Sequence, residues 1–199
     1  MPEYPEIINR SKEMQQALLG LRIEHIIVLQ DKCLNIPVET LIEQVLGQTF
    51  QSFSSHGKWI IADLSKDTLL INLGMGGEIL HIDKLAELPE KHRIILRLSD
   101  QSSLVINFWW FGYFHFVYGK DLSSHKMIAS LGQDVMQIPL DDFHGLVSRS
   151  KQRVKTLLLD QKKIAGIGNF YIHDILFKAG IHPLTPANQL SAEQNKKAV

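Results

Sequence analysis

Six short apolar segments follow one another between residues 58 and 118, separated by turn-forming residues. Within each segment the apolar side chains alternate with the period of a β-strand. Several short strands at this spacing are typical of an antiparallel sandwich or barrel. The expected strands are residues 58–64, 68–73, 78–82, 93–98, 103–108 and 112–118.

Helical periodicity flanks this strand-rich region on both sides. Near the chain start, Pro5 suits a first helical turn, and apolar residues recur at helical spacing until Gly20. Other expected elements are a strand over residues 22–29 and helices over 38–46, 141–150 and 151–161. The expected fold class is therefore α+β. An antiparallel β-sandwich with an N-terminal helix forms the domain over residues 1–128, and an all-α domain follows over residues 129–199.

The segment 162–183, KKIAGIGNFYIHDILFKAGIHP, predicts a helix preceded by a glycine loop. Its apolar residues fall at helical spacing, Asn169 is placed to cap the helix start, and Gly180 ends the run. Gly166 and Gly168 allow the backbone to pass close to another group. Backbone N–H groups at such a loop and helix start favour an anion. On spacing alone, the favoured alternative is a helix hairpin whose glycines only allow tight packing.

Composition does not by itself indicate a nucleic-acid partner. Lys plus Arg and Asp plus Glu both number 21 among 199 residues, so the formal charge is zero. Six basic residues nevertheless lie near the glycine loop, although each also suits a solvated helix face: Arg149, Lys151, Arg153, Lys155, Lys162 and Lys163. Cys33 is the only cysteine, which excludes an internal disulfide and a cysteine-based zinc site and fits a reducing cytoplasm. No metal site is expected, and no segment approaches the ~20 apolar residues of a membrane span.

Four separated motifs carry a family resemblance. They are Met1-Pro2-Glu3-Tyr4-Pro5-Glu6, His56-Gly57-Lys58, Leu73-Gly74-Met75-Gly76-Gly77-Glu78 and the stretch 157–183. In this order they resemble the family of formamidopyrimidine-DNA glycosylases and endonuclease VIII, and the last motif is similar to its helix-two-turns-helix element. The resemblance implies a bifunctional DNA glycosylase and abasic-site lyase of base excision repair. Such a protein is expected to act without a cofactor on damaged double-stranded DNA, as a cytoplasmic, nucleoid-associated monomer.

The chain start carries the expected chemistry. If Met1 is removed, the Pro2 nitrogen becomes a secondary amine that can attack the deoxyribose C1′ and displace the damaged base. The resulting iminium cation is an electron sink from which the 3′ phosphate leaves by β-elimination. The resemblance implies that Glu3 protonates the sugar ring oxygen, that Glu6 supports the site, and that Lys58 contacts a phosphate and assists proton transfer. Without the other motifs, this start is simply a capped helix and Lys58 a solvated strand-edge residue.

The resemblance also assigns residues to DNA binding. The matching phosphate-contacting positions are Lys155, Gly166, Gly168 and Asn169. A duplex hides C1′, so the nucleotide must be extruded and the gap filled. Met75 matches a void-filling methionine and Phe111 an intercalating phenylalanine, with burial in the sandwich core as the alternative for both. Trp109 replaces the arginine that reads the orphaned base, and strand alternation places only one of Trp109 and Trp110 on the DNA side.

The sequence also lacks the four-cysteine zinc ribbon of the family and the arginine that the ribbon carries. The chain is expected to be either a truncated relative or a fragment of a longer product. The alternative function is therefore a relative that binds damaged or abasic DNA without efficient catalysis. A third class, an RNA-binding or ribosomal protein with the same helical element, leaves Pro2 and Glu3 without a purpose.

Overall fold

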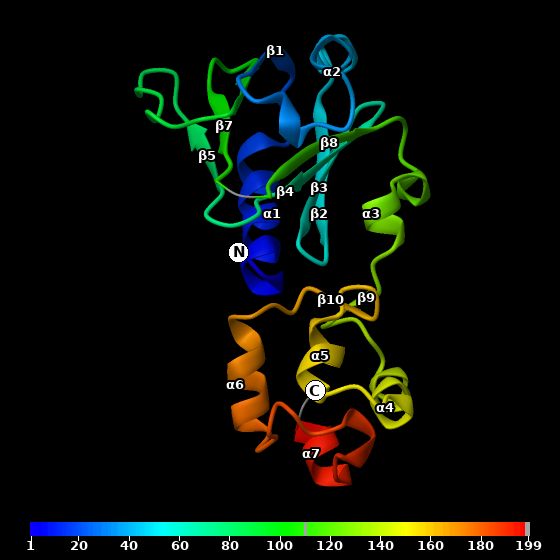
Figure 1. Ribbon diagram of the computed structural model, residues 1–199. Coiled ribbons are helices and arrows are strands. Elements are labelled where there is room, and N and C mark those ends of the chain that lie inside the picture. Colours follow the sequence, from blue (N-terminus) through cyan, green and yellow to red (C-terminus); the bar gives the residue numbers. More distant parts are fainter. Residues whose placement is uncertain (110, 198–199) are drawn as a thin grey trace. The chain divides into compact units, whose positions relative to one another are not determined.

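The computed structural model describes residues 1–109 and 111–197 (Figure 1). The chain divides into two compact units, Met1–Lys126 and Met127–Val199. Each unit has its own cluster of buried apolar side chains. The first unit contains helices and antiparallel sheets and the second is mainly helical, which confirms the expected α+β class.

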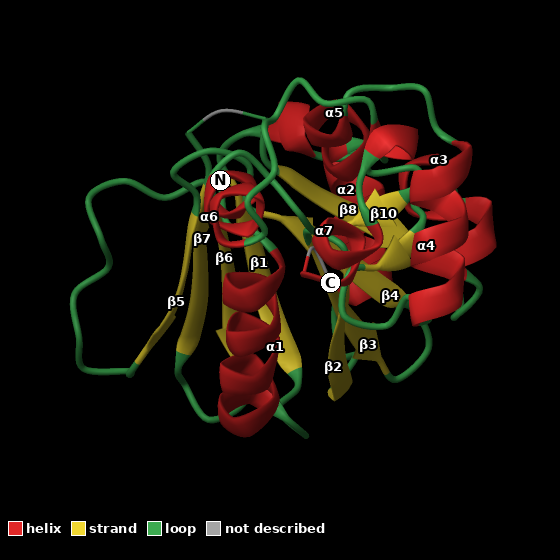
Figure 2. Ribbon diagram, turned by 90° about the horizontal axis from the view of Figure 1, so that it is seen from below, coloured by secondary structure: helices red, strands yellow, loops and turns green. Residues whose placement is uncertain are grey.

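Two four-stranded antiparallel sheets form the first unit, and their strands can be followed in Figure 2. The strand orders are β1–β6–β7–β5 and β2–β3–β4–β8. Apolar side chains of both sheets belong to one continuous core, so the sheets form the expected sandwich. The strands are β1 (Ile23–Val28), β2 (Phe50–His56), β3 (Trp59–Leu64), β4 (Thr68–Asn72), β5 (Glu78–Ile82), β6 (Ile94–Leu98), β7 (Ser103–Asn107) and β8 (Tyr113–Val117).

Helix α1 (Tyr4–Leu18) packs along β2 and β3. Ile7, Met14 and Leu18 enter the sandwich core from one face of the helix, as their helical spacing requires. The Ser11 hydroxyl donates to the Ser54 carbonyl of β2 at 3.0 Å and so fixes the helix along the strand. Helix α2 (Val38–Val45) adds further apolar side chains to the same core.

The second unit consists mainly of short helices. Two-residue strands β9 (Gln133–Asp134) and β10 (Ile164–Ala165) pair in parallel beside them. The buried faces of α4, α5 and α6 form the core of this unit. The helices are α3 (Lys126–Ala129), which begins at the last residue of the first unit, α4 (Leu140–Arg149), α5 (Val154–Leu159), α6 (Tyr171–Lys178) and α7 (Ala192–Lys197).

Two expectations about these elements are wrong. Strand β2 was not expected, because its sequence FQSFSSH is largely polar and only Phe50 is fully buried. The helix expected over residues 151–161 covers only α5. Its start is displaced because Arg153 forms a β-bridge with Pro186, and its end is followed by a turn in which the Asp160 carboxylate accepts a hydrogen bond from the Lys162 N–H.

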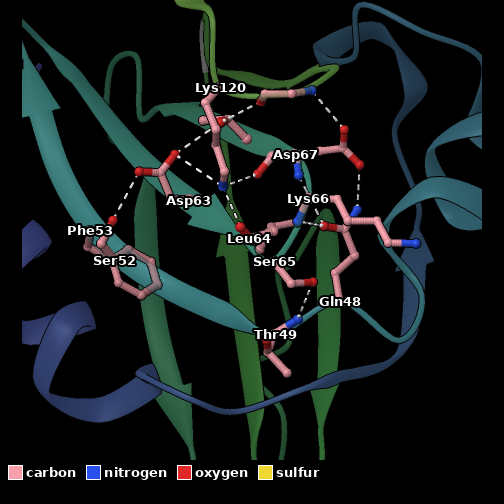
Figure 3. A network of polar contacts seen from close by, with 12 residues as sticks. Gln48, Thr49, Ser52, Phe53, Asp63, Leu64, Ser65, Lys66, Asp67 and Lys120 are labelled. Carbon is pink, nitrogen blue, oxygen red and sulfur yellow. Dashed lines mark hydrogen bonds and ion pairs between the residues drawn. The ribbon is translucent and has the colours of Figure 1, made fainter.

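A polar network fixes the end of β8 to the β3–β4 turn (Figure 3). The buried Asp67 carboxylate accepts from the Gly119 N–H at 2.8 Å and from Gln48 Nε2 at 2.6 Å. Lys120 Nζ donates to the carbonyls of Leu64 and Asp67. These bonds satisfy polar groups that would be costly to leave unpaired, so the segment that leaves the sandwich after β8 starts from a fixed position.

Candidate active site

The start of α1 holds Pro2 and Glu3 in a defined arrangement. Glu3 is the N-cap residue, is only 3% exposed, and forms a capping box with Glu6. The Glu6 N–H donates to the Glu3 carboxylate, and the Glu3 N–H donates to Glu6 Oε2 at 2.9 Å. Glu6 therefore bonds the backbone at the helix start and fixes Glu3. Pro2 is half-buried and directly precedes Glu3 at this hydrogen-bonded helix start.

Lys58 lies in the tight turn between β2 and β3, one residue before the strand that it was expected to lead. His56 pairs with Trp59, so Gly57 and Lys58 form a two-residue turn, and Gly57 has the positive φ of 57° that such a turn requires. Lys58 is half-buried, and this burial lowers the pKa of its ammonium group. The negative charge of Glu3 acts in the opposite sense on the Lys58 pKa. The fold therefore brings Lys58 within electrostatic range of Glu3.

A residue outside the four sequence motifs connects the Lys58 turn to the next loop. Asn72, at the end of β4, donates from Nδ2 to the Lys58 carbonyl at 3.1 Å. Its Oδ1 accepts from the Gly74 N–H at 3.0 Å. Gly74 immediately precedes Met75, so one side chain contacts both loops that carry candidate residues.

Three candidate aromatic and apolar residues lie on the surface. Met75 is 50% exposed, Trp109 63% and Phe111 69%, so the alternative of burial in the sandwich core is wrong for Met75 and Phe111. Their two loops lie side by side, because a Cβ added to Gly76 would lie 3.3 Å from Trp109 Cγ. Phe111 has a φ of 57°, a strained conformation for a bulky residue. The expectation for Trp110 falls outside the described residues.

A cation faces Trp109. Lys91 Nζ lies 5.8 Å from the centroid of the Trp109 ring, within cation–π range. Trp109 also lines a 490 Å³ pocket together with Leu29, residues 90–93 and residues 107–108. Neither contact was expected from the sequence, because residue 91 lies in a loop without periodicity. The exposed indole thus has a basic neighbour.

In the second unit, the glycine loop between α5 and α6 is held by Gln161. Its Oε1 accepts from the Gly166 N–H at 3.0 Å, and its Nε2 donates to the carbonyls of Leu159 at 3.1 Å and Ile167 at 2.7 Å. Gly166 and Gly168 are buried, whereas Asn169 is exposed. The expected capping position of Asn169 is wrong, since Phe170 is the N-cap residue of α6. Asn169 instead leaves its side chain at the surface, directly before the helix.

The basic residues near this loop are not equivalent. Lys163 Nζ donates to Gln152 Oε1 at 2.7 Å and lies 3.8 Å from the Asp160 carboxylate. Lys155 Nζ, on α5, lies 3.4 Å from His173 Nε2 on α6, and this contact is at the surface. Lys163 thus lies beside a carboxylate, whereas the partner of Lys155 is the ring of His173.

The sequence matches two family models. The formamidopyrimidine-DNA glycosylase N-terminal domain matches residues 1–108, and the formamidopyrimidine-DNA glycosylase H2TH domain matches residues 131–199. The formamidopyrimidine-DNA glycosylase of Listeria innocua is 31% identical over 198 residues, which cover 98% of this chain and 72% of the relative. That of Mycoplasma mobile is 32% identical over 199 residues, which cover 98% and 73%. The chain belongs to the formamidopyrimidine-DNA glycosylase family.

This family consists of DNA glycosylases that act in base excision repair on damaged DNA. Similar solved structures come from the Lactococcus lactis enzyme. A mutant of that enzyme in complex with tetrahydrofuran-containing DNA has a TM-score of 0.90 at 23% identity, over 99% of this chain and 74% of the other. Its complex with Fapy-dG-containing DNA has a TM-score of 0.89 at 22% identity, over 98% and 74%. These likenesses confirm the fold expected for a formamidopyrimidine-DNA glycosylase.

Two further findings concern metal binding and membrane spans in the part of the chain that the structure describes. Residues 1–109 and 111–197 include no group of three or more His, Cys, Asp or Glu side chains that could hold a metal ion. Over the same ranges, no helix has both the length and the apolar character needed to cross a membrane.

Proposed function

We propose that the protein is a bifunctional DNA glycosylase and abasic-site lyase that uses the Pro2 amine as its nucleophile on oxidised bases in double-stranded DNA. The observation that supports this most is the arrangement at the start of α1, where a buried carboxylate lies directly beside Pro2 and in electrostatic contact with Lys58. In this proposal the domain over residues 1–128 supplies the chemistry, and the domain over residues 129–199 supplies the phosphate contacts.

The reaction begins when the Pro2 nitrogen attacks C1′ of the damaged nucleotide. The new N–C1′ bond replaces the bond to the base, which leaves with that electron pair and takes up a proton. Glu3 donates a proton to the ring oxygen as the C1′–O4′ bond breaks, giving a cationic iminium. A basic side chain then takes the C2′ proton, the electrons of the C2′–H bond convert the iminium into an enamine, and the enamine re-forms a conjugated iminium as it expels the 3′ phosphate with the C3′–O electron pair. Water then releases the sugar from Pro2.

Lys58 is suited to a proton transfer in this sequence. Burial lowers the pKa of its ammonium group, so a larger fraction is neutral near physiological pH than for an exposed lysine. The negative charge of Glu3 acts in the opposite sense and raises the Lys58 pKa, but burial is the larger effect. Glu6 acts indirectly, because its hydrogen bond to the Glu3 N–H holds the corner of the helix in place.

DNA binding is divided between two sets of residues in this proposal. Met75, Trp109 and Phe111 are exposed apolar side chains that can fill the space left by an extruded nucleotide. The phosphate-binding set is Lys155, Gly166, Gly168 and Asn169. Within this set Gly166 shapes the loop, because its N–H already donates to Gln161.

The deciding experiment is covalent trapping. Borohydride should reduce the iminium and link the protein to DNA that contains an abasic site, and Pro2 can form that iminium only if its α-amine is free. Pro2→Gly is expected to reduce the adduct, and retention of Met1, read by intact-protein mass spectrometry, to abolish it. Trapping that survives a blocked N-terminus would assign the reaction to another amine. Tight binding to abasic DNA without any trapping would identify the chain as a binding module.

A further inference from the structure

The backbone pairing between β3 and β4 stops just before the candidate active site. The pairs run from Asp63 with Thr68 to Ile60 with Ile71, and Trp59 and Asn72 lie beyond the last pair. At this point the Asn72 side chain makes the next contact across the strands, from Nδ2 to the Lys58 carbonyl at 3.1 Å. The turn that carries Lys58 is thereby tied to β4.

The other end of the same amide shapes the Met75 loop. Asn72 Oδ1 accepts from the Gly74 N–H at 3.0 Å, two residues further along the chain, which is an Asx turn. Gly74 has a φ of 57°, in the left-handed region, so the chain reverses there before Met75. Only a side chain with one donor and one acceptor can make both bonds at once, and a primary amide supplies both.

We propose that Asn72 is a positioning residue that holds the Lys58 turn and the Met75 loop in one fixed relation. The inference rests on the proposed function, in which Lys58 transfers a proton and Met75 fills the void left by the extruded nucleotide. The Asn72 amide thereby positions both Lys58, which acts at the sugar, and Met75, which inserts into the duplex.

The pKa of Lys58 provides an independent measure of whether Asn72 holds the Lys58 turn in place. Half-burial of its side chain lowers the pKa of its ammonium group. Release of the turn exposes the ammonium group to water, so its pKa should rise towards the ordinary lysine value. This change can be measured on the free protein, whether or not the protein is active.

Two substitutions separate the two hydrogen bonds. Asn72→Leu removes both and adds no charge, so it reports the pKa of Lys58 without a new electrostatic effect. Asn72→Asp keeps an acceptor for the Gly74 N–H but has no donor for the Lys58 carbonyl. Asn35 offers a matched control, because its amide also makes two backbone bonds, to the Phe116 carbonyl at 2.8 Å and from the Phe116 N–H at 2.7 Å. Asn35→Leu and Asn35→Asp therefore remove equivalent bonds elsewhere in the same unit.

Three measurements on the full chain test the proposal. The pKa of Lys58 is read from ¹³C-dimethylated protein, with the resonance assigned through Lys58→Arg. The rate of β-elimination is measured in single turnover on abasic DNA. Insertion is followed by 2-aminopurine fluorescence next to a tetrahydrofuran site.

Both Asn72 variants are expected to slow elimination by roughly tenfold to a hundredfold, the size found when a reacting group is misplaced. The leucine variant should also raise the Lys58 pKa and lose the insertion signal, whereas the aspartate variant should keep that signal. The Asn35 variants should leave all three readouts unchanged.

Equal behaviour of the Asn72 and Asn35 variants in the rate and in the Lys58 pKa would overturn the proposal. If the aspartate variant does not fold, the leucine variant carries the same test, since both lack the donor to Lys58. If the parent shows no trapping on abasic DNA, the proposed function fails, and the Lys58 titration still decides whether Asn72 positions that residue.

Discussion

Acid should destabilise the first unit through a buried pair of histidines. His115, on β8, is 8% exposed, and its Nδ1 lies 2.8 Å from Nε2 of His125, which follows the short helix η2 (Leu122–Ser124). Trp59 and Tyr113 pack against the His115 ring, with centroids 5.6 and 5.1 Å away. Burial lowers the pKa of His115 to about 4, and repulsion by a charge on His125 contributes in the same direction. Burial also lowers the pKa of His125.

The sign of the effect follows from which state binds the extra proton. Between pH 6.5 and 4, the unfolded chain protonates residue 115 while the folded protein does not. The contribution of neutral His115 to stability is therefore complete above pH 6.5 and is lost as the pH falls towards 4. At about 1.4 kcal/mol for each unit of pKa, the free energy of unfolding falls by about 3 kcal/mol over the whole titration. About 2 kcal/mol of this is lost between pH 8 and about pH 5.

Urea unfolding of the full chain at pH 8 and pH 5, followed by circular dichroism, measures this loss. His115→Gln keeps a hydrogen-bonding group but cannot take up the proton, so it should be less stable than the parent at pH 8 and should lose less stability on acidification. His25→Gln, on the exposed surface of β1, is the control and should follow the parent. Parallel pH dependence in the parent and the His115 variant would refute the reasoning.

Three other predictions concern packing, phosphate contacts and base discrimination. Gly112→Ala should lower stability by about 1–3 kcal/mol in thermal unfolding, because the added Cβ would lie 2.0 Å from a ring atom of buried Phe108, whereas Gly145→Ala, with nothing within 4 Å, should not destabilise α4. Lys155→Ala should weaken binding to all duplexes similarly and reduce the salt slope by about one; altered lesion preference with unchanged affinity would contradict this. Trp109→Arg should add about 1–3 kcal/mol of preference for one opposite base when excision is measured against all four, and a strong preference for cytosine in the parent would contradict the prediction.

Apolar patterning predicted the elements in which most positions are buried. Strand β3 has five buried positions among six and β7 is buried throughout, so both stand out in the sequence. Helix α1 is equally clear, since its apolar residues share one face and a proline lies in its first turn. Strand β2 lacks such a signal because α1 covers it through polar contacts, including the Ser11 to Ser54 bond. A strand that is held by hydrogen bonds to a helix leaves little hydrophobic pattern to detect.

The candidate residues could be named from motifs, but not the residues that hold them. Glu6 could be assigned to the helix start because a capping box joins residues three apart in the chain. Asn72 reaches Lys58 across 14 positions, and His115 meets His125 between a strand and a loop. Gln161 lies in the glycine motif itself, yet its three bonds depend on the conformation of the loop. Contacts of this kind depend on register and backbone geometry, which periodicity does not specify.

The loop from Phe108 to Gly112 explains why large aromatic residues are exposed on this unit. Phe108 is buried in the sandwich core, and Gly112 lies against its ring so closely that no Cβ fits between them. Trp109, next to Phe108, and Phe111, next to Gly112, are both exposed, and Phe111 has a positive φ. Exposure of each ring forgoes about 1.5–3 kcal/mol of burial, and the conformation of Phe111 costs about 1–3 kcal/mol more. These costs fall beside the exposed Met75 and fit the role proposed for the three side chains, for which the space left by an extruded nucleotide offers an apolar stacking contact.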